Sequence, residues 1–270
     1  LVQRLWATAG GVLLLASALL LLLLRRVRQT GRLLASNQAR LKVQSERDAL
    51  TGASSRRHAQ AVLAEAGAQG HLSGALLMVD LDHFKQINDR HGHAAGDEVL
   101  ATMAQRIMSA LRPQDLVARW GGEEFLVYAG DMGRDEADAL ASRLLHAVSG
   151  QPVELKTAGA QALRVTASIG HAVFPLAPHG LAVGVEQATN LVDMALYSAK
   201  GQGRHRAVGI VGCDASTAAA LRDVEADFEG AWQAGRLQLR TDLGPGPVLD
   251  HAPAGAHWAP IEQNLSETHP

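Results

Sequence analysis

The sequence has little of several features that mark common protein classes. It contains a single cysteine, Cys213, so no disulfide can form within the chain, and a reducing compartment suits most of it. Aromatic residues make up only 4%, and no basic stretch interleaved with them offers a platform for nucleic acid. The pattern G-x-x-x-x-G-K-[ST] is missing, which excludes a P-loop nucleoside triphosphatase.

Charge is unevenly distributed, although the net charge is only −2. Residues 1–47 carry eight Arg or Lys side chains against one acid, and the rest of the chain has nine more acids than bases. Residues 5–24 carry no charge, and nine of the last twelve of them are leucine. About 20 apolar residues in a helix span the ~30 Å core of a bilayer, so we expect a transmembrane helix over residues 1–24.

Two other structures fit an apolar run of this length: a buried core helix and the apolar part of a cleaved signal peptide. Arg25 and Arg26 stand where a signal peptide would have a small-residue cleavage site, which favours the membrane helix. The positive-inside rule then places the chain from Arg25 onward in the cytoplasm.

Residues 25–47 are polar, with apolar residues seven apart at Val27, Leu34 and Leu41. This spacing indicates a helical linker that pairs with a second copy as a parallel coiled coil. Only about three heptads are present and the intervening core positions are polar, so a basic helix lying along the membrane is the alternative.

Beyond residue 47 the sequence alternates between short apolar runs, which predict strands, and amphipathic segments, which predict helices. Expected strands cover 75–79, 116–120, 125–128, 163–173 and 206–211, and expected helices cover 96–111, 135–148 and 186–199. This order favours an α+β fold with a mainly antiparallel central sheet flanked by helices. Residues 48–208 would form that domain. Residues 209–270 would be a tail, with a helix over 217–232 and disorder after it.

Three carboxylates stand near the ends of expected strands. Asp80 follows a buried run, and Glu123 and Glu124 follow Gly121 and Gly122, which predict a tight hairpin with positive φ. An Asp that ends a strand is often only a turn or helix cap, and acids at a hairpin tip are often merely solvated. If the strands bring the three together, their repulsion requires a cation, and carboxylate oxygens suit Mg²⁺ with a bound polyphosphate.

Five motifs occur in order around these acids. They are D-A-L-T-G-A-S-S-R-R at 48–57, D-L-D-H-F-K-Q-I-N-D with G-H-A-A-G-D within 80–97, G-G-E-E-F at 121–125, T-A-S-I-G at 166–170 and Y-S-A-K-G-Q-G-R at 197–204. In these motifs the chain resembles the GGDEF family of diguanylate cyclases, from residue 48 to about residue 206. The resemblance implies a fold like that of nucleotidyl cyclases and the polymerase palm.

The resemblance also implies a reaction in which two GTP molecules are joined into cyclic di-GMP with release of two pyrophosphates, with Mg²⁺ or Mn²⁺ as cofactor. Asp80, the backbone carbonyl of Leu81 and Glu123 would hold the metal. Glu123 would also help to activate the attacking 3′-hydroxyl, with Glu124 as a supporting acid, so these two glutamates are the expected catalytic residues.

Substrate contacts follow from the same resemblance. Asn88 and Asp97 would recognise guanine. A carboxylate accepts hydrogen bonds from the N1–H and the exocyclic amine of the base, and an amide can form hydrogen bonds with its other edges. The other expected substrate-binding residues, mostly phosphate contacts, are Phe84, Lys85, His93, Lys200 and Arg204. An R-x-x-D motif, Arg112 to Asp115, would be an inhibitory site for the product.

Each subunit of such an enzyme binds one GTP, so the resemblance implies a homodimer. The expected partners are GTP, cyclic di-GMP and the membrane, at a bacterial inner-membrane location, and no nucleic acid. The alternative is a non-catalytic receptor of the same fold that binds GTP or cyclic di-GMP. The acids and the guanine-reading residues that a cyclase needs are present, which favours the enzyme.

Overall fold

The strands and helices are labelled in chain order. The strands are β1 (Ser54–Ser55), β2 (Gly74–Leu81), β3 (Leu116–Arg119), β4 (Glu124–Ala129), β5 (Val153–Leu155), β6 (Gln161–Leu163), β7 (Ala167–Phe174), β8 (Arg206–Cys213) and β9 (Leu237–Leu243). The helices are α2 (Arg56–Ala66), α3 (Phe84–His91), α4 (His93–Ser109), α5 (Arg134–Ser149), α6 (Val185–Gly201), α7 (Ala218–Ala226) and α8 (Phe228–Gln233). The computed structural model describes Arg26 and residues 46–68, 70–157 and 161–245.

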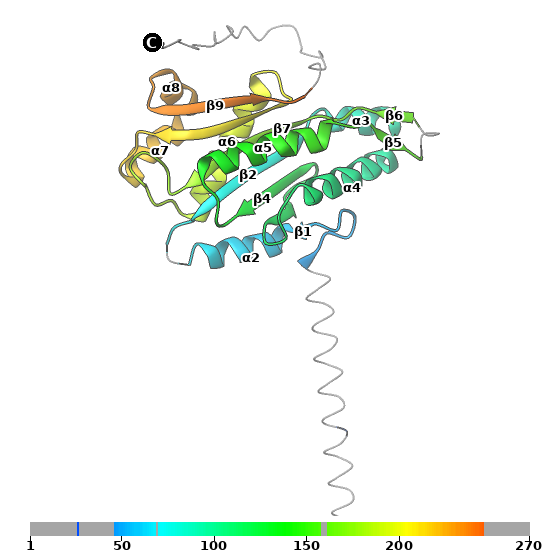
Figure 1. The fold of residues 1–270 in the computed structure, drawn as a ribbon, viewed down its shortest axis with the longest axis horizontal. Coiled ribbons are helices and arrows are strands. Elements are labelled where there is room, and N and C mark those ends of the chain that lie inside the picture. The colour runs from blue at the N-terminus through cyan, green and yellow to red at the C-terminus, as the bar shows by residue number, and fades with distance from the viewer. Residues whose placement is uncertain (1–25, 27–45, 69, 158–160, 246–270) are drawn as a thin grey trace, which may run out of the picture. The chain divides into compact units, whose positions relative to one another are not determined.

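A seven-stranded sheet runs through the described part of the chain, with helices on both faces (Figure 1). The strand order β1-β3-β4-β2-β7-β8-β9 places β2, the strand that contains Asp80, at the centre. The pairs β1–β3 and β7–β8 are parallel, and the other neighbouring pairs are antiparallel. The expected central sheet with flanking helices is therefore confirmed, as a mixed sheet in which antiparallel pairs predominate.

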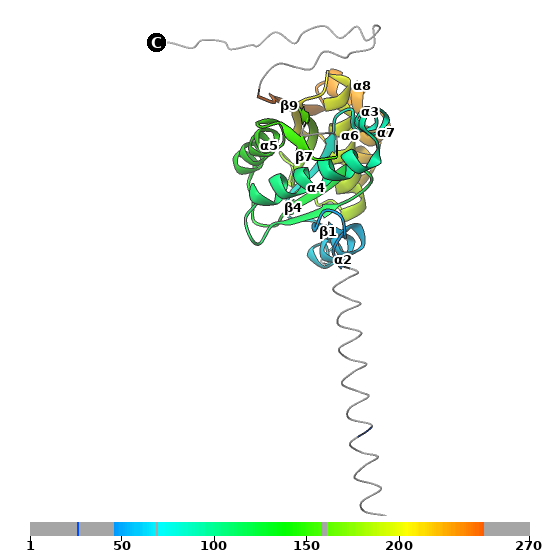
Figure 2. The same cartoon turned by 90° about the vertical axis from the view of Figure 1, so that its right-hand side faces the viewer.

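Side chains of β2 alternate between two hydrophobic cores. Leu77 and Val79 belong to the core under α3, α4 and α5, and Leu76 and Met78 to the core under α2, α6, α7 and α8. Figure 2 shows α4 and α5 on one side of the sheet and α6 and α7 on the other. Because both faces are covered, every residue of β2 is buried, which is why its sequence is a continuous apolar run.

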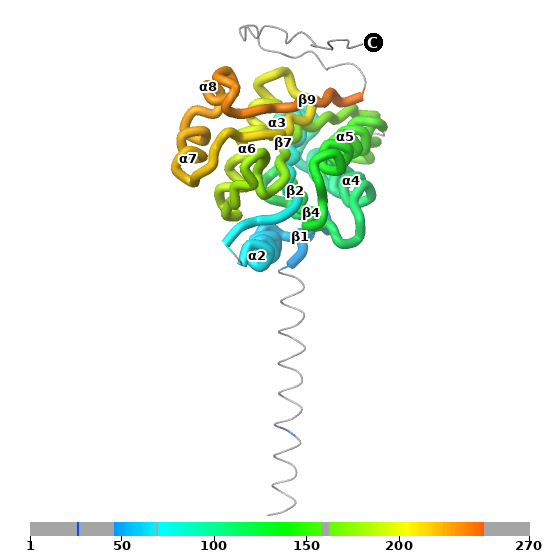
Figure 3. The backbone as a smooth tube through the Cα atoms, turned by 60° about the vertical axis from the view of Figure 1, so that its left-hand side comes forward, coloured from blue at the N-terminus to red at the C-terminus, as the bar shows by residue number. Residues whose placement is uncertain are grey.

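The strand β7 and the helix α6, which lie side by side in Figure 3, approach closely at Gly170, the last residue of T-A-S-I-G. A Cβ at this position would collide with the Val192 carbonyl and with the backbone of Leu196 on α6. Glycine is required here because it alone leaves room for the helix backbone, which fixes how deeply α6 seats on the sheet.

Two expected elements are wrong in their limits. The strand expected over 163–173 is two strands: β6 pairs with β5 in a separate hairpin, and β7 begins only at Ala167. β7 pairs with β2 from Ala167 onward, and the Asp82 N–H donates to the Thr166 carbonyl at 2.9 Å, which extends the same register by one residue. The helix expected over 217–232 is two helices, because Asp227 leaves the helical conformation and caps α8 with a hydrogen bond to the Gly230 N–H.

The sheet continues beyond residue 208. β8 extends to Cys213, and β9 pairs with it in antiparallel register at the edge of the sheet. The expected disorder at the end of the tail falls on residues 246–270, which lie outside the described residues.

The expected membrane helix over 1–24 also lies outside the described residues, as does most of the linker over 25–47. In the part of the chain that the structure describes, no helix is both long enough and apolar enough to cross a bilayer.

The contact at Gly170 gives a stability prediction. Gly170→Ala should lower the free energy of unfolding by about 2–4 kcal/mol, because the added methyl meets backbone that cannot move independently. Urea denaturation followed by circular dichroism measures this change. Gly201→Ala is the control: its Cβ points into open space, so it should leave stability unchanged or raise it by about 0.5–1 kcal/mol. Equal stability of the two variants would contradict the close packing.

Candidate active site

The central strands end in a group of acids. Asp80 of β2 lies directly opposite Glu124 of β4 in the antiparallel register, so both side chains point to the same face of the sheet. Glu123 precedes β4, and its backbone carbonyl accepts a hydrogen bond from the Leu81 N–H at 3.4 Å. The structure thus brings the expected metal-binding positions next to the expected catalytic pair.

Asp80 carries the strongest electrostatic effect of the group. The residue is only 6% exposed, and burial raises the pKa of its carboxyl to about 6. The Lys200 ammonium, 2.8 Å from Oδ2, acts in the opposite direction, and the negative charges of Glu123 and Glu124 raise the pKa further. Three carboxylates are therefore close enough to repel one another, and one ammonium balances them only in part.

The donor atoms at this edge fit a divalent cation, because carboxylate and carbonyl oxygens are the ligands that hard cations prefer. Among the described residues, no three His, Cys, Asp or Glu side chains converge into a preassembled metal site. Asp80 contacts Lys200 instead, so the ammonium supplies part of the positive charge that the acids require. A cation of this kind would need oxygens from a bound phosphate to complete its ligand set.

The G-G-E-E-F loop is not the turn expected from the sequence. Neither Gly121 nor Gly122 has positive φ, so the expected primed turn is wrong. The loop is closed by the Trp120 N–H, which donates to the Glu124 carbonyl at 2.8 Å, and by the Arg119 side chain, whose Nε and Nη2 donate to the Gly122 carbonyl at 3.1 and 2.8 Å. The Glu124 carboxylate lies against Gly121, so a Cβ at this position would displace Oε2 of Glu124.

Two residues of the first motif, residues 48–57, contact the segment that leads into this loop. The sequence did not predict these contacts. Nη1 of Arg119 lies 3.4 Å from the Asp48 carboxylate. The Arg56 guanidinium stacks over the Trp120 ring, 4.7 Å from its centroid. Since residues 119 and 120 lead directly into G-G-E-E-F, both contacts hold the loop in place.

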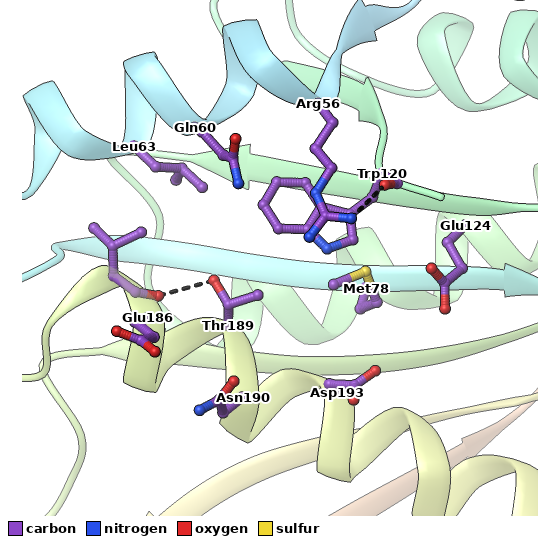
Figure 4. Close-up of a pocket in the computed structure, with 11 residues that line it drawn as sticks. Arg56, Gln60, Leu63, Met78, Trp120, Glu124, Glu186, Thr189, Asn190 and Asp193 are labelled. Carbon is purple, nitrogen blue, oxygen red and sulfur yellow. Dashed lines mark hydrogen bonds between the residues drawn. The ribbon is translucent and has the colours of Figure 1, made fainter. Parts of the chain in front are cut away.

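A cavity of about 700 Å³ adjoins Glu124, between α2 and α6 (Figure 4). Arg56 and Trp120 lie on one side of it, and Asn190 and Asp193 project from α6 on the other (Figure 4). The cavity therefore has stacked planar groups facing hydrogen-bonding side chains.

Asp82 is a second buried acid, which the sequence analysis did not single out. It accepts hydrogen bonds from the Thr166 hydroxyl at 2.7 Å, the Ser168 hydroxyl at 2.7 Å and the His205 N–H at 3.1 Å. These bonds tie the loop after β2 to β7 and to the segment after α6. The hydroxyls of T-A-S were the available signal, but their partner across the sheet could not be read from local sequence.

Asn88 and Asp97 lie on the two helices of a helical hairpin, α3 and α4. Gly92, with φ 82°, makes the turn between the helices. A Cβ at Gly96 would collide with the Asn88 side-chain amide, so that amide lies directly over the residue before Asp97. Asn88 is half-buried and Asp97 is exposed, so the expected guanine-reading pair meets at a surface that a ligand can reach.

The other expected substrate residues have different surroundings. Phe84 is buried in the core, so only its backbone is available to a ligand, whereas Lys85 and His93 are exposed in the first turns of α3 and α4. Lys200 lies on Asp80, and Arg204 follows α6 with φ 62°. The structure places Lys200 at the acids and shows no contact of Lys85, His93 or Arg204 with them.

Arg112 and Asp115 close a turn between α4 and β3. The Arg112 N–H donates to Oδ2 of Asp115 at 2.9 Å, and the Asp115 N–H donates to the Arg112 carbonyl at 3.0 Å. The Arg112 guanidinium is 3.1 Å from Oε1 of Glu136, with both side chains about half exposed. Exposed pairs of this kind contribute little to stability, so the guanidinium is available to exchange partners.

Comparison with known proteins settles the family. The family model for "Diguanylate cyclase, GGDEF domain" matches residues 45–206. The chain belongs to the GGDEF family. The diguanylate cyclase DgcM of Escherichia coli (strain K12) is 38% identical over 179 residues, which are 63% of this chain and 41% of that protein. The chain spans less than half the length of the curated relatives that it matches.

Solved GGDEF structures have the same fold. The diguanylate cyclase SiaD of Pseudomonas aeruginosa, in complex with its activator SiaC, is similar with a TM-score of 0.55 and 32% identity over 77% of this chain and 84% of the solved chain. The coiled coil and GGDEF domain of DgcB from Caulobacter crescentus, in complex with c-di-GMP, gives a TM-score of 0.61 and 25% identity over 68% of this chain and 97% of that solved fragment. All expected site residues of this GGDEF chain fall within the matched range, and α7, α8 and β9 follow it.

The raised pKa of Asp80 predicts a stability change with a definite sign. Because its pKa when folded, about 6, lies above the ordinary 3.8, ionised Asp80 costs folding free energy above pH 6, and this cost disappears as the pH falls below 4. Asp80→Asn should therefore raise the free energy of unfolding by about 1–3 kcal/mol near pH 8. Near pH 4 it should change little.

Thermal unfolding in the presence of a chelator, at both pH values, measures this difference. Asp223→Asn on α7, an exposed position, is the matched control and should show no pH-dependent gain. A Tm for Asp80→Asn below that of the wild type near pH 8 would contradict the repulsion.

Proposed function

We propose that this chain is a diguanylate cyclase that condenses two GTP molecules into cyclic di-GMP and two pyrophosphates. The proposal rests above all on Asp80, which is buried at the end of the central strand beside Glu123 and Glu124 and is only partly balanced by Lys200. Family membership supports the same activity. A cluster with surplus negative charge is suited to a polyphosphate that arrives with a divalent cation.

In each of the two transfers, the 3′-oxygen of one GTP attacks the α-phosphorus of the facing GTP. One P–O bond forms, the bond to pyrophosphate breaks, and the hydroxyl proton leaves with the help of Glu123. Mg²⁺ or Mn²⁺, held by Asp80, the Leu81 carbonyl and Glu123, would neutralise phosphate charge and orient the phosphates. Lys200, released from Asp80, would pair with phosphate oxygens, and Glu124 would keep the local charge negative.

Guanine selection is assigned to Asn88 and Asp97. The Asp97 carboxylate accepts from the guanine N1–H and exocyclic amine, a pattern that adenine does not offer. The Asn88 amide, held over Gly96, serves another edge of the base. Lys85 and His93 are exposed at the starts of the same two helices and would contact the bound nucleotide.

The same proposal includes the membrane and a homodimer. Residues 5–24 have the length and apolarity of a membrane-spanning helix, and the basic residues after them favour a cytoplasmic catalytic domain. The linker over 25–47 would pair two copies, so that two half-sites, each with one GTP, can face each other.

One assay tests the activity. The full chain, purified in detergent, is incubated with GTP and Mg²⁺, and the product is identified by mass. Cyclic di-GMP should form, and Asp80→Asn and Glu123→Gln should each lower the rate about 100-fold or more, because each removes charge that the transition state needs. Glu65→Gln, on the exposed side of α2, is the matched control and should keep the wild-type rate. GTP turnover that yields no cyclic di-GMP would refute the proposal.

Product feedback at Arg112 and Asp115 is proposed on the geometry of their turn. A product phosphate would replace Glu136 as the partner of the Arg112 guanidinium, with bidentate geometry. Arg112→Ala should therefore raise the inhibition constant of cyclic di-GMP about tenfold or more. Glu136→Gln should lower that constant about threefold, because it removes the competing carboxylate.

Initial rates at increasing product concentrations measure both constants. The two variants are expected to change inhibition in opposite directions without a change in the uninhibited rate. Unchanged inhibition in Arg112→Ala would exclude this site.

A further inference from the structure

The turn after α6 has an unusual backbone conformation. Among the described residues, the non-glycine residues with positive φ are His83, Arg204 and His205, and the last two are consecutive, with φ 62° and 51°. Gly203 before them has φ 114°. Left-handed backbone is costly for a residue with a Cβ, and it persists only where the surrounding contacts fix it. Three consecutive residues with positive φ therefore indicate a turn that other parts of the chain hold in place.

The end of β9 supplies part of this support. The N–H of Gly244, the residue after β9, donates to the His205 carbonyl at 2.8 Å. The Thr241 hydroxyl of β9 donates to Oε1 of Gln202 at 3.2 Å. Both ends of the turn are thus bonded to a strand that follows the part of the chain matched by the family model.

The His205 ring is buried against the same glycine. The residue is 3% exposed, and a Cβ at Gly244 would collide with its ring. Neither ring nitrogen of His205 has a hydrogen-bond partner among the described residues, and burial of unpaired polar atoms lowers stability. Burial also holds the pKa of His205 below its ordinary value of 6.5, so the ring is uncharged near pH 7 and offers no positive charge to a phosphate. The ring therefore acts through the space that it fills, between the turn and Gly244.

The backbone of His205 connects this turn to the acids. Its N–H donates to Oδ2 of Asp82 at 3.1 Å, and Asp82 directly follows Leu81, whose carbonyl is an expected metal ligand. On the other side of the turn, the Lys200 ammonium lies 2.8 Å from Oδ2 of Asp80. The turn is therefore held at both ends beside the buried acids.

We propose that His205 is a positioning residue that holds Arg204 at the phosphates of GTP, and that the end of β9 keeps His205 in place through Gly244. The Arg204 carbonyl accepts a hydrogen bond from Nε of Arg206 at 2.8 Å, which fixes the same turn from its other neighbour. The inference rests on the proposed function, since a phosphate contact of Arg204 presupposes bound GTP. It assigns a part in nucleotide binding to a C-terminal strand outside the matched range.

The residues expected to recognise guanine lie elsewhere. Asn88 and Asp97 belong to α3 and α4, whereas the contacts of the turn come from the end of β9 and from Asp82. A change that displaces the turn should therefore weaken the contacts with phosphate and leave those with guanine intact. General damage to the fold would weaken both.

Nucleotide affinity tests the positioning directly. The full chain and its Gly244→Ala variant are purified in detergent, and calorimetry with Mg²⁺ measures the affinity for a non-reactive GTP analogue and for GMP. The added methyl displaces the His205 ring, so the affinity for the analogue should fall about tenfold, the effect of one charge-assisted contact. GMP lacks the β- and γ-phosphates, so its affinity should change less than about twofold.

Two variants of His205 test the turn itself. His205→Ala removes the ring and places a residue that disfavours the left-handed region at φ 51°, so it should weaken binding of the GTP analogue about tenfold. Asn is enriched in that region, so His205→Asn should keep the affinity within about threefold of the wild type. An Asn variant as weak as the Ala variant would contradict the role of the left-handed turn.

Gly184→Ala, where an added Cβ meets open space, is the matched control and should leave both affinities unchanged. Equal losses of affinity for the analogue and for GMP in Gly244→Ala, or no loss for either, would overturn the positioning role. Cyclic di-GMP synthesis by the wild type is measured in parallel. Synthesis together with unchanged affinities in Gly244→Ala refutes the positioning and leaves the proposed function intact. A selective loss for the analogue without any synthesis by the wild type refutes the function and leaves the positioning intact.

Discussion

Negative charge buried at the end of the central strand is the constraint on which the rest of the structure depends. Asp80 lies within β2, where both faces of the strand are covered, so its carboxylate cannot be well hydrated. Glu123 and Glu124 add charge of the same sign, and Lys200 offsets only part of it. Such an arrangement is costly in the free chain and becomes favourable when cations and phosphates arrive together, as a nucleotide with its metal does.

Several features of the fold keep this charge in place. Gly170 lets α6 seat against β7, and Lys200, near the end of that helix, reaches Asp80. Asp82 accepts hydrogen bonds from the hydroxyls of Thr166 and Ser168, and the Arg119 side chain donates to the Gly122 carbonyl in the G-G-E-E-F loop. These contacts come from segments far apart in the sequence. The motifs of the family therefore act together to hold the acids in position.

The sequence predicted most of the central strands and helices, because their apolar residues repeat with a regular period. It did not predict the contacts between residues that are far apart in the sequence. The buried run before Asp80 and the amphipathic helices were recognisable because burial imposes a periodicity. The loop at Gly121 was predicted as a primed turn from its two glycines, but composition alone does not determine φ, and neither glycine has positive φ in the structure. The hydrogen bonds of Asp82 and the pairing of β9 with β8 were missed because their partners lie far away in the sequence.

A crystal structure of the full chain with Mn²⁺ and a non-reactive GTP analogue would show whether the buried acids take up a metal together with the nucleotide. Anomalous scattering locates the metal without reference to the protein. We expect a manganese peak between Asp80 and Glu123, with the Lys200 ammonium moved from Asp80 to the phosphates. If Lys200 still contacts Asp80 with the nucleotide in place and no manganese lies at the acids, the acids are not a metal site.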